Sequence, residues 1–491
     1  MIPPPPALDF SILAPLGFVA AGAFLVLLGD GWLSRGPGPV LPWLVMICTA
    51  ALGLALFTGV TAFAFGGSAP FNATHAMLRA DAFSSGLSVV IGVVALLSVW
   101  LSMSHLAALR IEDGECYALL MLSVCGMLVS VLAIDMMTLF VGLELMSLPL
   151  YALAALDGRS ARSGEAGLKF LVLGGLASAI ALYGMALLYG ATGVTSFEGV
   201  RSRFDPESEL ALLGLGLVTA AFAMRFAAAP FHQWAPDVEE GAPTGVSAFL
   251  SVGVRVASVA AFLRFVALSL PSISEELRLG VIALATASIG LGSLMALIQT
   301  RVKRLLAYAG VAQVGFVLIG VAVGTPNAWV AALFSLGAYA LASLGALGLV
   351  GALAWGGRER ESLDDLAGLG RTRPLLAGGM TLFVLSLAAF PGTAGFVGRF
   401  ALLESAVNAG FVGLAGVSSI GGVVLLAAYL RLPVSFYLRR TTAAPPEPLD
   451  TFAGLALCVC VFGLLWLGWF PESGGAGLLP MLRPAVAVLT P

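Results

Sequence analysis

Fourteen apolar runs, each about the length needed to cross a lipid bilayer, occupy most of this 491-residue chain. A membrane-spanning helix needs about 20 consecutive apolar residues, and in lipid its backbone must satisfy its own hydrogen bonds. Only 10% of the residues are charged, whereas soluble proteins carry roughly 25%. The runs therefore predict an all-α, polytopic membrane protein of about 14 transmembrane helices. The expected helices lie near residues 10–30, 41–65, 82–104, 115–132, 134–156, 167–190, 208–230, 246–269, 277–299, 304–324, 327–355, 376–409, 412–438 and 451–470.

Basic residues are distributed unevenly between the two sets of loops. Loops after odd-numbered helices carry 14 Lys and Arg residues, and the other loops carry 5. The positive-inside rule then places the odd loops in the cytoplasm and both termini on the outer side. No Lys or Arg precedes Arg35. A secretory signal needs a basic start, so the first apolar run is expected to remain as an uncleaved helix.

Four ionisable side chains lie well inside separate apolar runs: Glu144, Arg225, Arg255 and Arg399. A charge at membrane depth costs several kcal/mol, and such residues usually mark a transport pathway or an ion pair. One carboxylate and three bases in four different helices favour a charge-transfer path. The alternative is a set of structural ion pairs that only hold the bundle together.

Two of the expected helices contain residues that interrupt a helix. Pro230 lies near the end of the seventh, and Pro391 and Gly392 lie within the twelfth. Proline removes a backbone donor and frees carbonyl groups, which lipid tolerates only beside protein or a wet cavity. Two interrupted helices five spans apart, each with a nearby arginine, are typical of two repeats of opposite topology. Ordinary proline kinks are the alternative.

The polar linkers are too short to form separate domains, since the longest run over residues 193–209 and 356–373. We therefore expect one membrane domain with four consecutive sections. These are helices 1–3 in residues 1–110, a first five-helix repeat in residues 111–270, a second, inverted repeat in residues 271–440, and the last helix with its tail in residues 441–491.

His232 follows the first interruption, a position that suits a proton-relay or gating role; a plain packing role is the alternative. The acidic residues that come next, Asp237, Glu239 and Glu240, are expected to form a solvated mouth. Lys303 begins the tenth helix at the cytoplasmic edge, where a long basic side chain usually reaches toward water. His105 is expected to lie in a loop without an assigned role.

Six motifs follow one another along the chain: GLELMSLPLYALAA (142–155), SGEAGLKF (163–170), LYGATG (188–193), APFHQWAPDVEEGAP (229–243), VKRLLAY (302–308) and PGTAGFVGR (391–399). Together they resemble the antiporter-like membrane subunits, and in particular subunit N, of NADH-quinone oxidoreductase, the respiratory complex I. The resemblance covers about residues 110–440. The first hundred residues are similar only in hydropathy.

The resemblance implies a subunit of the membrane arm of complex I in a bacterial inner membrane. In such a membrane the loop charges place both termini in the periplasm. Its partners would be other membrane-arm subunits, the lipid bilayer and protons. The family conducts protons along a central chain of buried charges, driven by electron transfer in other subunits. Glu144 would be the fifth-helix glutamate that pairs with a base on the seventh helix, here Arg225. Arg255, Arg399, His232 and Lys303 would complete the path or gate it.

Redox cofactors are not expected in this chain. The sequence has no nucleotide loop, haem pair, flavin pattern or iron–sulfur pattern, so NADH, FMN, iron–sulfur clusters and quinone would bind other subunits. The five cysteines lie in apolar runs without metal-ligand spacing, and we expect them to pack as small hydrophobic residues. No basic patch of the kind that binds nucleic acid occurs.

The chain departs from the family pattern at the residues that would carry protons. The family usually has lysine where this chain has Arg225, Arg255 and Arg399, and histidine where it has Gln313. Arginine has a reference pKa of about 12.5–13.8, and discharging it at neutral pH costs about 8 kcal/mol. The arginines are therefore expected to act as fixed charges that gate the path. Two alternatives remain: a cation/proton antiporter or membrane hydrogenase subunit, and a structural relative that no longer pumps.

Overall fold

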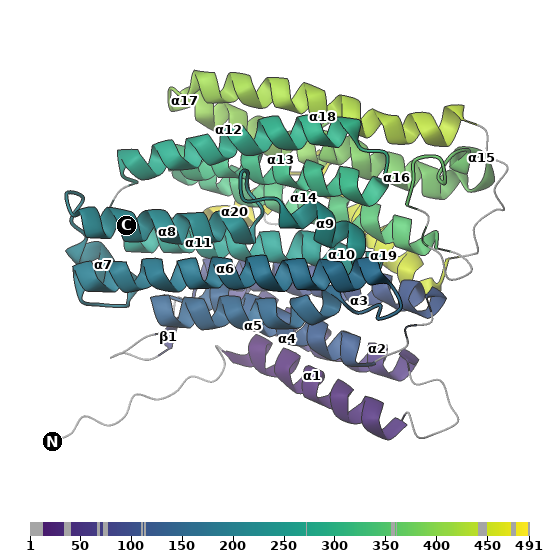
Figure 1. Ribbon diagram of the computed structural model, residues 1–491, viewed down its shortest axis with the longest axis horizontal. Coiled ribbons are helices and arrows are strands. Elements are labelled where there is room, and N and C mark those ends of the chain that lie inside the picture. Colours follow the sequence, from purple (N-terminus) through teal and green to yellow (C-terminus); the bar gives the residue numbers. More distant parts are fainter. Residues whose placement is uncertain are drawn as a thin grey trace.

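The computed structural model describes residues 13–33, 41–65, 69–71, 77–109, 111, 114–271, 273–354, 359, 361–439, 449–472 and 478–489. These residues form a bundle of roughly parallel helices (Figure 1). Twelve helices in the described part are long and apolar enough to cross a membrane. Two further spans are each interrupted in the middle. The prediction of about fourteen transmembrane helices in an all-α protein is therefore confirmed.

The uninterrupted spans follow the predicted ranges closely, because hydropathy alone determines them. They are α1 (Ala14–Leu33), α2 (Leu41–Phe65), α3 (Ala82–Ala108), α4 (Gly114–Leu132), α5 (Met136–Ala154), α6 (Ala161–Thr192), α12 (Glu275–Ile298), α13 (Val302–Val323), α14 (Pro326–Ala352), α18 (Val412–Leu438), α19 (Thr451–Trp469) and the combined span of α10 (Thr244–Phe249), a π-helical turn (Leu250–Val254) and α11 (Arg255–Ser269).

The two interrupted spans are each made of two helices. The first is α8 (Glu209–Arg225) followed by α9 (Trp234–Gly241), and the second is α16 (Pro374–Leu387) followed by α17 (Ala394–Asn408). Shorter elements that the sequence did not predict are α7 (Phe197–Arg203), α15 (Leu369–Thr372), α20 (Leu478–Ala487) and an antiparallel hairpin of β1 (Ala69–Phe71) and β2 (Leu78–Ala80).

Both interruptions begin with the same backbone turn, before the prolines that predicted them. After α8, Ala227 has a φ of 59° and the Ala228 N–H donates to Ala223 O at 2.8 Å. After α16, Ala389 has a φ of 57° and the Phe390 N–H donates to Leu385 O at 2.9 Å. A left-handed residue with this bond is the Schellman ending of a helix. The helices therefore end at Arg225 and Leu387, earlier than the sequence indicated.

A second backbone feature also occurs twice. Asp135, before α5, forms an isolated β-bridge with Ser196, after α6. Arg301, before α13, forms one with Ser362, after α14. Each residue of the second bridge lies 166 positions after the corresponding residue of the first. The hydrogen bonds correspond as well, since the Met136 N–H donates to Thr195 O and the Val302 N–H donates to Glu361 O. The short helices beside them, α7 and α15, lie at opposite ends of the bundle (Figure 1).

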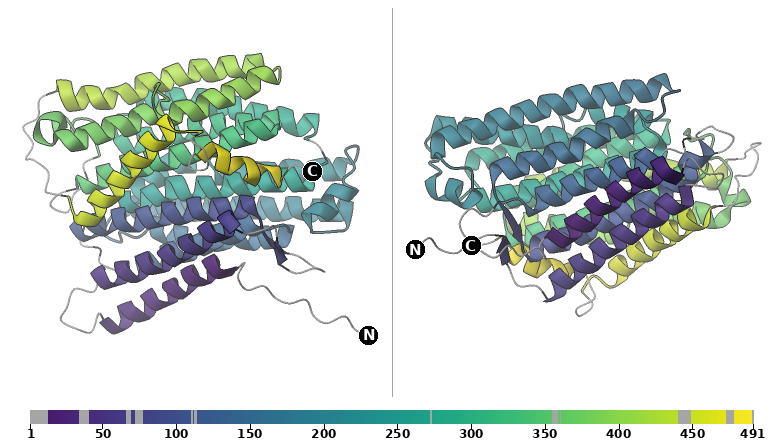
Figure 2. Two further views of the ribbon diagram at one scale, coloured as in Figure 1. Left: turned by 180° about the vertical axis from the view of Figure 1, so that it is seen from behind. Right: turned by 90° about the horizontal axis from the view of Figure 1, so that it is seen from below.

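The combined span from Thr244 to Ser269 lies wholly inside the bundle, and every residue of α11 is buried. The helices α13 and α14 are almost as fully buried. By contrast α1, α2, α6, α12, α18 and α19 leave large apolar side chains on the outside, among them Phe57, Tyr183, Ile298, Ile420 and Phe462. Figure 2 shows α19 running obliquely across one face, where it packs against α3, α14 and α17. The molecule therefore presents lipid-compatible faces around a buried centre.

Candidate functional site: a line of buried charges

The structure brings Glu144 and Arg225 together, as the sequence predicts. Glu144 lies in the middle of α5, and Arg225 is the last residue of α8. Arg225 Nη2 lies 2.5 Å from Glu144 Oε1, and its Nη1 donates to Ser147 Oγ at 2.7 Å. The Ser178 hydroxyl of α6 contacts both partners. Each charge therefore has hydroxyl neighbours that also stabilise it, and Glu144 retains a side chain that is 24% exposed.

His232 lies in the interruption between α8 and α9. Its side chain is mostly buried, and Nδ1 has no hydrogen-bond partner among the described residues. The imidazole ring lies 6.1 Å, centroid to centroid, from the ring of Tyr308 on α13. An unpaired ring nitrogen at a helix break is a position where a proton can be accepted.

Arg255 forms a second buried ion pair, and its partner is Glu239 on α9. Arg255 Nη2 lies 2.7 Å from Glu239 Oε1, and both side chains are 2% exposed. Nη1 donates to the Ser251 carbonyl and hydroxyl and, at 3.0 Å, to the Tyr339 hydroxyl. The sequence-based expectation of a solvated mouth is therefore wrong for Glu239. Glu240 is also largely buried, at 6% exposed, but it lines a charged cavity together with Asp237.

Arg399, on α17, is buried without a carboxylate partner among the described residues. Its guanidinium donates to Leu387 O and Ala388 O, the carbonyls freed where α16 ends, at 3.1 and 3.3 Å. It also donates to Gln313 Oε1 at 3.3 Å, and its guanidinium carbon lies 4.0 Å from the centroid of the Phe316 ring. The partial negative charge of a helix C-terminus and the face of an aromatic ring both stabilise a cation.

One helix, α13, contacts most of these groups. Tyr308 faces His232, Gly310 lies against the Arg255 guanidinium, and Gln313 and Phe316 hold Arg399. Gly310 and Gln313 are three residues apart, so they share one face of the helix. The groups of the first interrupted span and those of the second therefore meet on α13.

Lys303, at the start of α13, is 1% exposed, so the sequence-based expectation that it reaches water is wrong. Its Nζ lies 2.9 Å from Glu359 Oε2 and 3.4 Å from Glu361 Oε1, and it donates to Ala242 O at 2.7 Å. The partners come from the linker after α14, far away in sequence. A basic residue with two acidic partners and a carbonyl has no need to reach solvent.

His105 is buried in the last turn of α3 and not in a loop. Its Nε2 lies 2.6 Å from Glu359 Oε1, while the Gly245 N–H donates to Nδ1 at 3.3 Å. Burial opposes ionisation of Glu359, but Lys303 and then His105 outweigh it and hold the pKa of this carboxyl well below its usual range. Burial, together with the neighbouring Glu359, raises the pKa of Glu361 in spite of Lys303.

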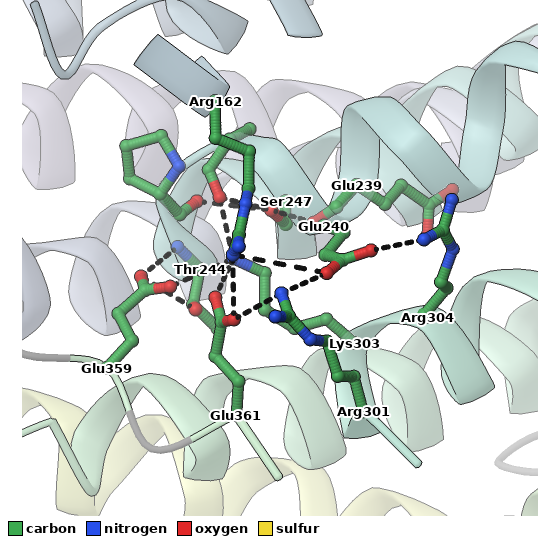
Figure 3. A network of polar contacts seen from close by, with 12 residues as sticks. Arg162, Glu239, Glu240, Thr244, Ser247, Arg301, Lys303, Arg304, Glu359 and Glu361 are labelled. Carbon is green, nitrogen blue, oxygen red and sulfur yellow. Dashed lines mark hydrogen bonds and ion pairs between the residues drawn. The ribbon is translucent and has the colours of Figure 1, made fainter. Parts of the chain in front are cut away.

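A charged cavity of about 340 Å³ opens beside this network. Figure 3 shows how Glu240 and Glu361 connect the arginines around it. Glu240 pairs with Arg301 and, at 3.1 Å, with Arg304, and Asp237 pairs with Lys169 at 2.7 Å. Asp237 is thus the one residue of the expected mouth that is partly exposed. The cavity is lined by Arg162, Glu165, Ala166, Lys169, Asp237, Glu240, Arg301 and Arg304.

The sequence analysis missed one further buried pair, Asp81 with Arg264. Arg264 is 0% exposed and donates to both carboxylate oxygens of Asp81, at 2.8 and 3.1 Å. Asp81 also caps α3 by accepting from the Ser84 N–H. The sequence offered a signal for the cap, because an aspartate directly before an apolar run is a preferred N-cap residue, but none for the pair with Arg264.

Fourteen spans, two of them interrupted, and an internal line of arginine and glutamate side chains define an antiporter-like membrane subunit. The family model for NADH:quinone oxidoreductase/Mrp antiporter membrane domains matches residues 133–424. The chain is 35% identical to an NADH-quinone oxidoreductase subunit N of Chloroflexus aggregans, over 95% of this chain and 96% of that one. It therefore belongs to the NADH-quinone oxidoreductase subunit N family.

Solved structures agree with this assignment. A chain of respiratory complex I from Thermus thermophilus with bound aureothin is 30% identical, with a TM-score of 0.78 over 95% of this chain and 98% of that one. A chain of the Mrp complex from a Dietzia species is 22% identical, with a TM-score of 0.86 over 98% of both chains. The second likeness concerns the fold alone.

Proposed function

We propose that this chain is the subunit N of a bacterial complex I and conducts protons across the inner membrane along its buried charges. It would be built into the membrane arm beside other subunits, and quinone reduction elsewhere in the complex would drive it. NADH, FMN, iron–sulfur clusters and quinone would be held by those other subunits. The observation that carries the proposal is the contact of α13 with His232, Arg255 and Arg399.

The roles along the path follow from the chemistry of the side chains. Arg225, Arg255 and Arg399 stay charged, because neutralising a guanidinium at pH 7 costs about 8 kcal/mol. They act as fixed electrostatic gates. Protons move on Glu144, on His232 and on bound water. Glu144 suits this role because its partner Arg225 has other acceptors, Ser147 and Leu143 O, that hold the guanidinium when the carboxylate is neutral.

The charged cavity is the proposed mouth of the path on the cytoplasmic side. Its residues come from the beginnings of α6 and α13 and from α9. These segments adjoin the loops that follow the fifth, ninth and seventh predicted helices, respectively. Those are the loops with the excess of Lys and Arg, so the positive-inside rule places them in the cytoplasm. Both termini then face the periplasm. Lys303 with its two acids closes the inner end of this region and gates it.

The path is built from two inverted five-helix repeats, residues 111–270 and 271–440, with residues 1–110 and 441–491 outside them. Two observations support this division. The interruptions after α8 and α16 share one Schellman turn with an alanine in the left-handed conformation. The two β-bridges lie at the same offset in both repeats. Five helices is an odd number, so the second copy runs in the opposite direction.

A proton-pumping assay on Glu144→Gln, assembled in the complex, tests the proposal. Membrane vesicles would be supplied with NADH, and proton uptake would be measured against NADH oxidised. We expect a lower proton-to-electron ratio with unchanged subunit composition. Glu404→Gln, at an exposed position of α17, serves as a control that should leave the ratio unchanged. An unchanged ratio in Glu144→Gln would remove Glu144 from the mechanism.

A second candidate function is a structural subunit that has lost transport. One observation favours it: Arg399 has only uncharged acceptors, and the neighbouring Gln313 does not titrate. On this reading the second repeat holds no proton carrier near Arg399. Replacing Arg399 by alanine separates the two candidates, as argued in the Discussion.

A further inference from the structure

The half-helix α9 presents acids to two different environments. Asp237 and Glu240 line the charged cavity. Residues three apart share a helix face, whereas Glu239, two residues from Asp237, lies about 200° away around the helix. It points to the opposite side, where it meets Arg255. One turn of α9 therefore carries acids that face the cavity and an acid that faces the interior of the bundle.

The pocket around Glu239 is built to hold a charge. Arg255 lies 11 residues after Thr244, where its span begins. At about 1.5 Å per residue this is about 16 Å from the start of the span. Its side chain points back toward the helix N-terminus, and so toward Glu239. Ser251 and Tyr339 accept from Nη1, the second terminal nitrogen of the guanidinium. The guanidinium thus keeps partners of its own when Glu239 is neutral.

One oxygen of Glu239 is left over. Oε1 accepts from Arg255, but Oε2 is buried and has no hydrogen-bond partner among the described residues. A buried, unsatisfied acceptor costs about 1–3 kcal/mol and needs an explanation. A site that takes up and releases a proton supplies one, because the free oxygen is where the proton binds.

The pair Asp81–Arg264 shows what a purely structural pair looks like in this protein. Arg264 donates to both oxygens of Asp81, and Oδ1 also caps α3. No carboxylate oxygen is free there. Both pairs are buried and both arginines lie on α11, so the difference lies in how the acid is satisfied. Glu239 instead resembles Glu144, whose arginine is shared with hydroxyl groups.

We propose that Glu239 is a second proton-carrying carboxylate, which transfers protons between the charged cavity and the buried line of charges. This inference rests on the proposed function. A hydronium ion in the cavity gives up its proton: one of its O–H bonds breaks, a neutral water is left, and a new O–H bond at Oε2 neutralises the acid, while Arg255 stays charged on Ser251 and Tyr339. The O–H bond then breaks, the proton passes to the next water or side chain along the path, and the ion pair re-forms.

The test compares Glu239→Gln with Asp81→Asn in the assembled complex, again as protons taken up per NADH oxidised. Glu239→Gln should lower the ratio as far as Glu144→Gln does. Each change leaves a buried arginine of α11 without its charged partner, which costs about 3–5 kcal/mol, so the two variants are matched in destabilisation. If Glu239 is only structural, both variants keep the parent ratio in the assembled complex. If it carries protons, the ratio falls in Glu239→Gln alone.

Infrared difference spectra of the complex, with and without NADH, detect changes in the protonation of carboxyl groups. A carboxylate with a purely structural role would not change its protonation. A band from a protonated carboxyl group should be lost in Glu239→Gln and kept in the matched control Asp81→Asn. A parent-like ratio in Glu239→Gln alongside a low ratio in Glu144→Gln overturns this inference alone. Parent-like ratios in both variants overturn the proposed function as well.

Discussion

The guanidinium carbon of Arg399 lies 4.0 Å from the centroid of the Phe316 ring. The other contacts of this guanidinium are carbonyl and amide oxygens, so its charge is held without a carboxylate among the described residues. The first two arginines of the line, by contrast, each face a glutamate at 2.5 and 2.7 Å. Of the three arginines in the line, Arg399 is therefore the one whose charge is least neutralised by its neighbours. It is also the one best placed to repel a nearby proton.

Arg399→Ala should abolish the contribution of this subunit to pumping, whereas Arg399→Lys should keep or raise it. An ammonium group preserves the charge, and burial can lower a lysine pKa by about 3–5 units from about 10.4, so that it can release a proton. The measurement is the proton-to-electron ratio of assembled complex. Arg439→Ala, a surface change at a side chain 57% exposed, is the control. A parent ratio in Arg399→Ala would favour the structural candidate.

The proposed orientation predicts the accessibility of two fusion sites. A reporter protein inserted after Asp364, whose side chain is 82% exposed, should be active in the cytoplasm. The same reporter at the carboxyl end should report the periplasm, because three expected helices separate the sites. The same answer from both sites would contradict the assignment of fourteen spans.

Glu359→Gln should make this subunit dissociate from the purified complex at a lower temperature. The expected loss of stability is about 1–3 kcal/mol. The change removes the closest acid from Lys303, which is almost fully buried, and a partner from His105. Glu361→Gln should have a smaller effect, since Glu361 is 3.4 Å from Lys303. Glu472→Gln, at a side chain 69% exposed, should have none.

The same ion pair predicts how the loss depends on pH. The pKa of Glu359 is lowered on folding from its ordinary 4.5. A lowered acid pKa stabilises the fold at all pH values above the unfolded pKa, and the stabilisation is lost only as the pH falls below it. The difference between parent and Glu359→Gln should therefore be constant between about pH 6 and 8. A difference that shrinks on going from pH 8 to 6 would contradict the assignment of a fixed charge.

The sequence predicted the spans well because hydropathy is a local property: the bounds of α2 and α18 are those expected. The resemblance to the antiporter-like subunits also predicted that Glu144 faces Arg225, as the structure shows. The role of Glu239 could not be predicted, because its neighbours Asp237 and Glu240 made the segment look solvated. The tertiary position of Arg255, across a helix break, shows which of the three acids points inward.

The burial of Lys303 and of His105 was not predicted, for the same reason. Their common partner Glu359 lies in a polar linker far away in sequence, and no local pattern links the three residues. For Glu239, the helical phase of α9 offered one local signal. It places residue 239 about 200° around the helix from residue 237 and about 100° from residue 240, as in any helix of about 3.6 residues per turn.

Gly310→Ala should lower the proton-to-electron ratio without preventing assembly. A Cβ at this position would lie 2.9 Å from both the Arg255 guanidinium carbon and the Tyr339 hydroxyl. These are the ends of side chains, so they can move, but only by lengthening the bonds that hold Arg255 in place. The pair with Glu239 at 2.7 Å would be disturbed first. The matched control is Gly290→Ala on α12, where an added Cβ meets nothing within 4 Å. Alanine is favoured over glycine in a helix by roughly 0.5–1 kcal/mol, so the control should assemble and pump as well as the parent. If Gly310→Ala pumps as well as Gly290→Ala, the position of the Arg255 guanidinium does not set the gate.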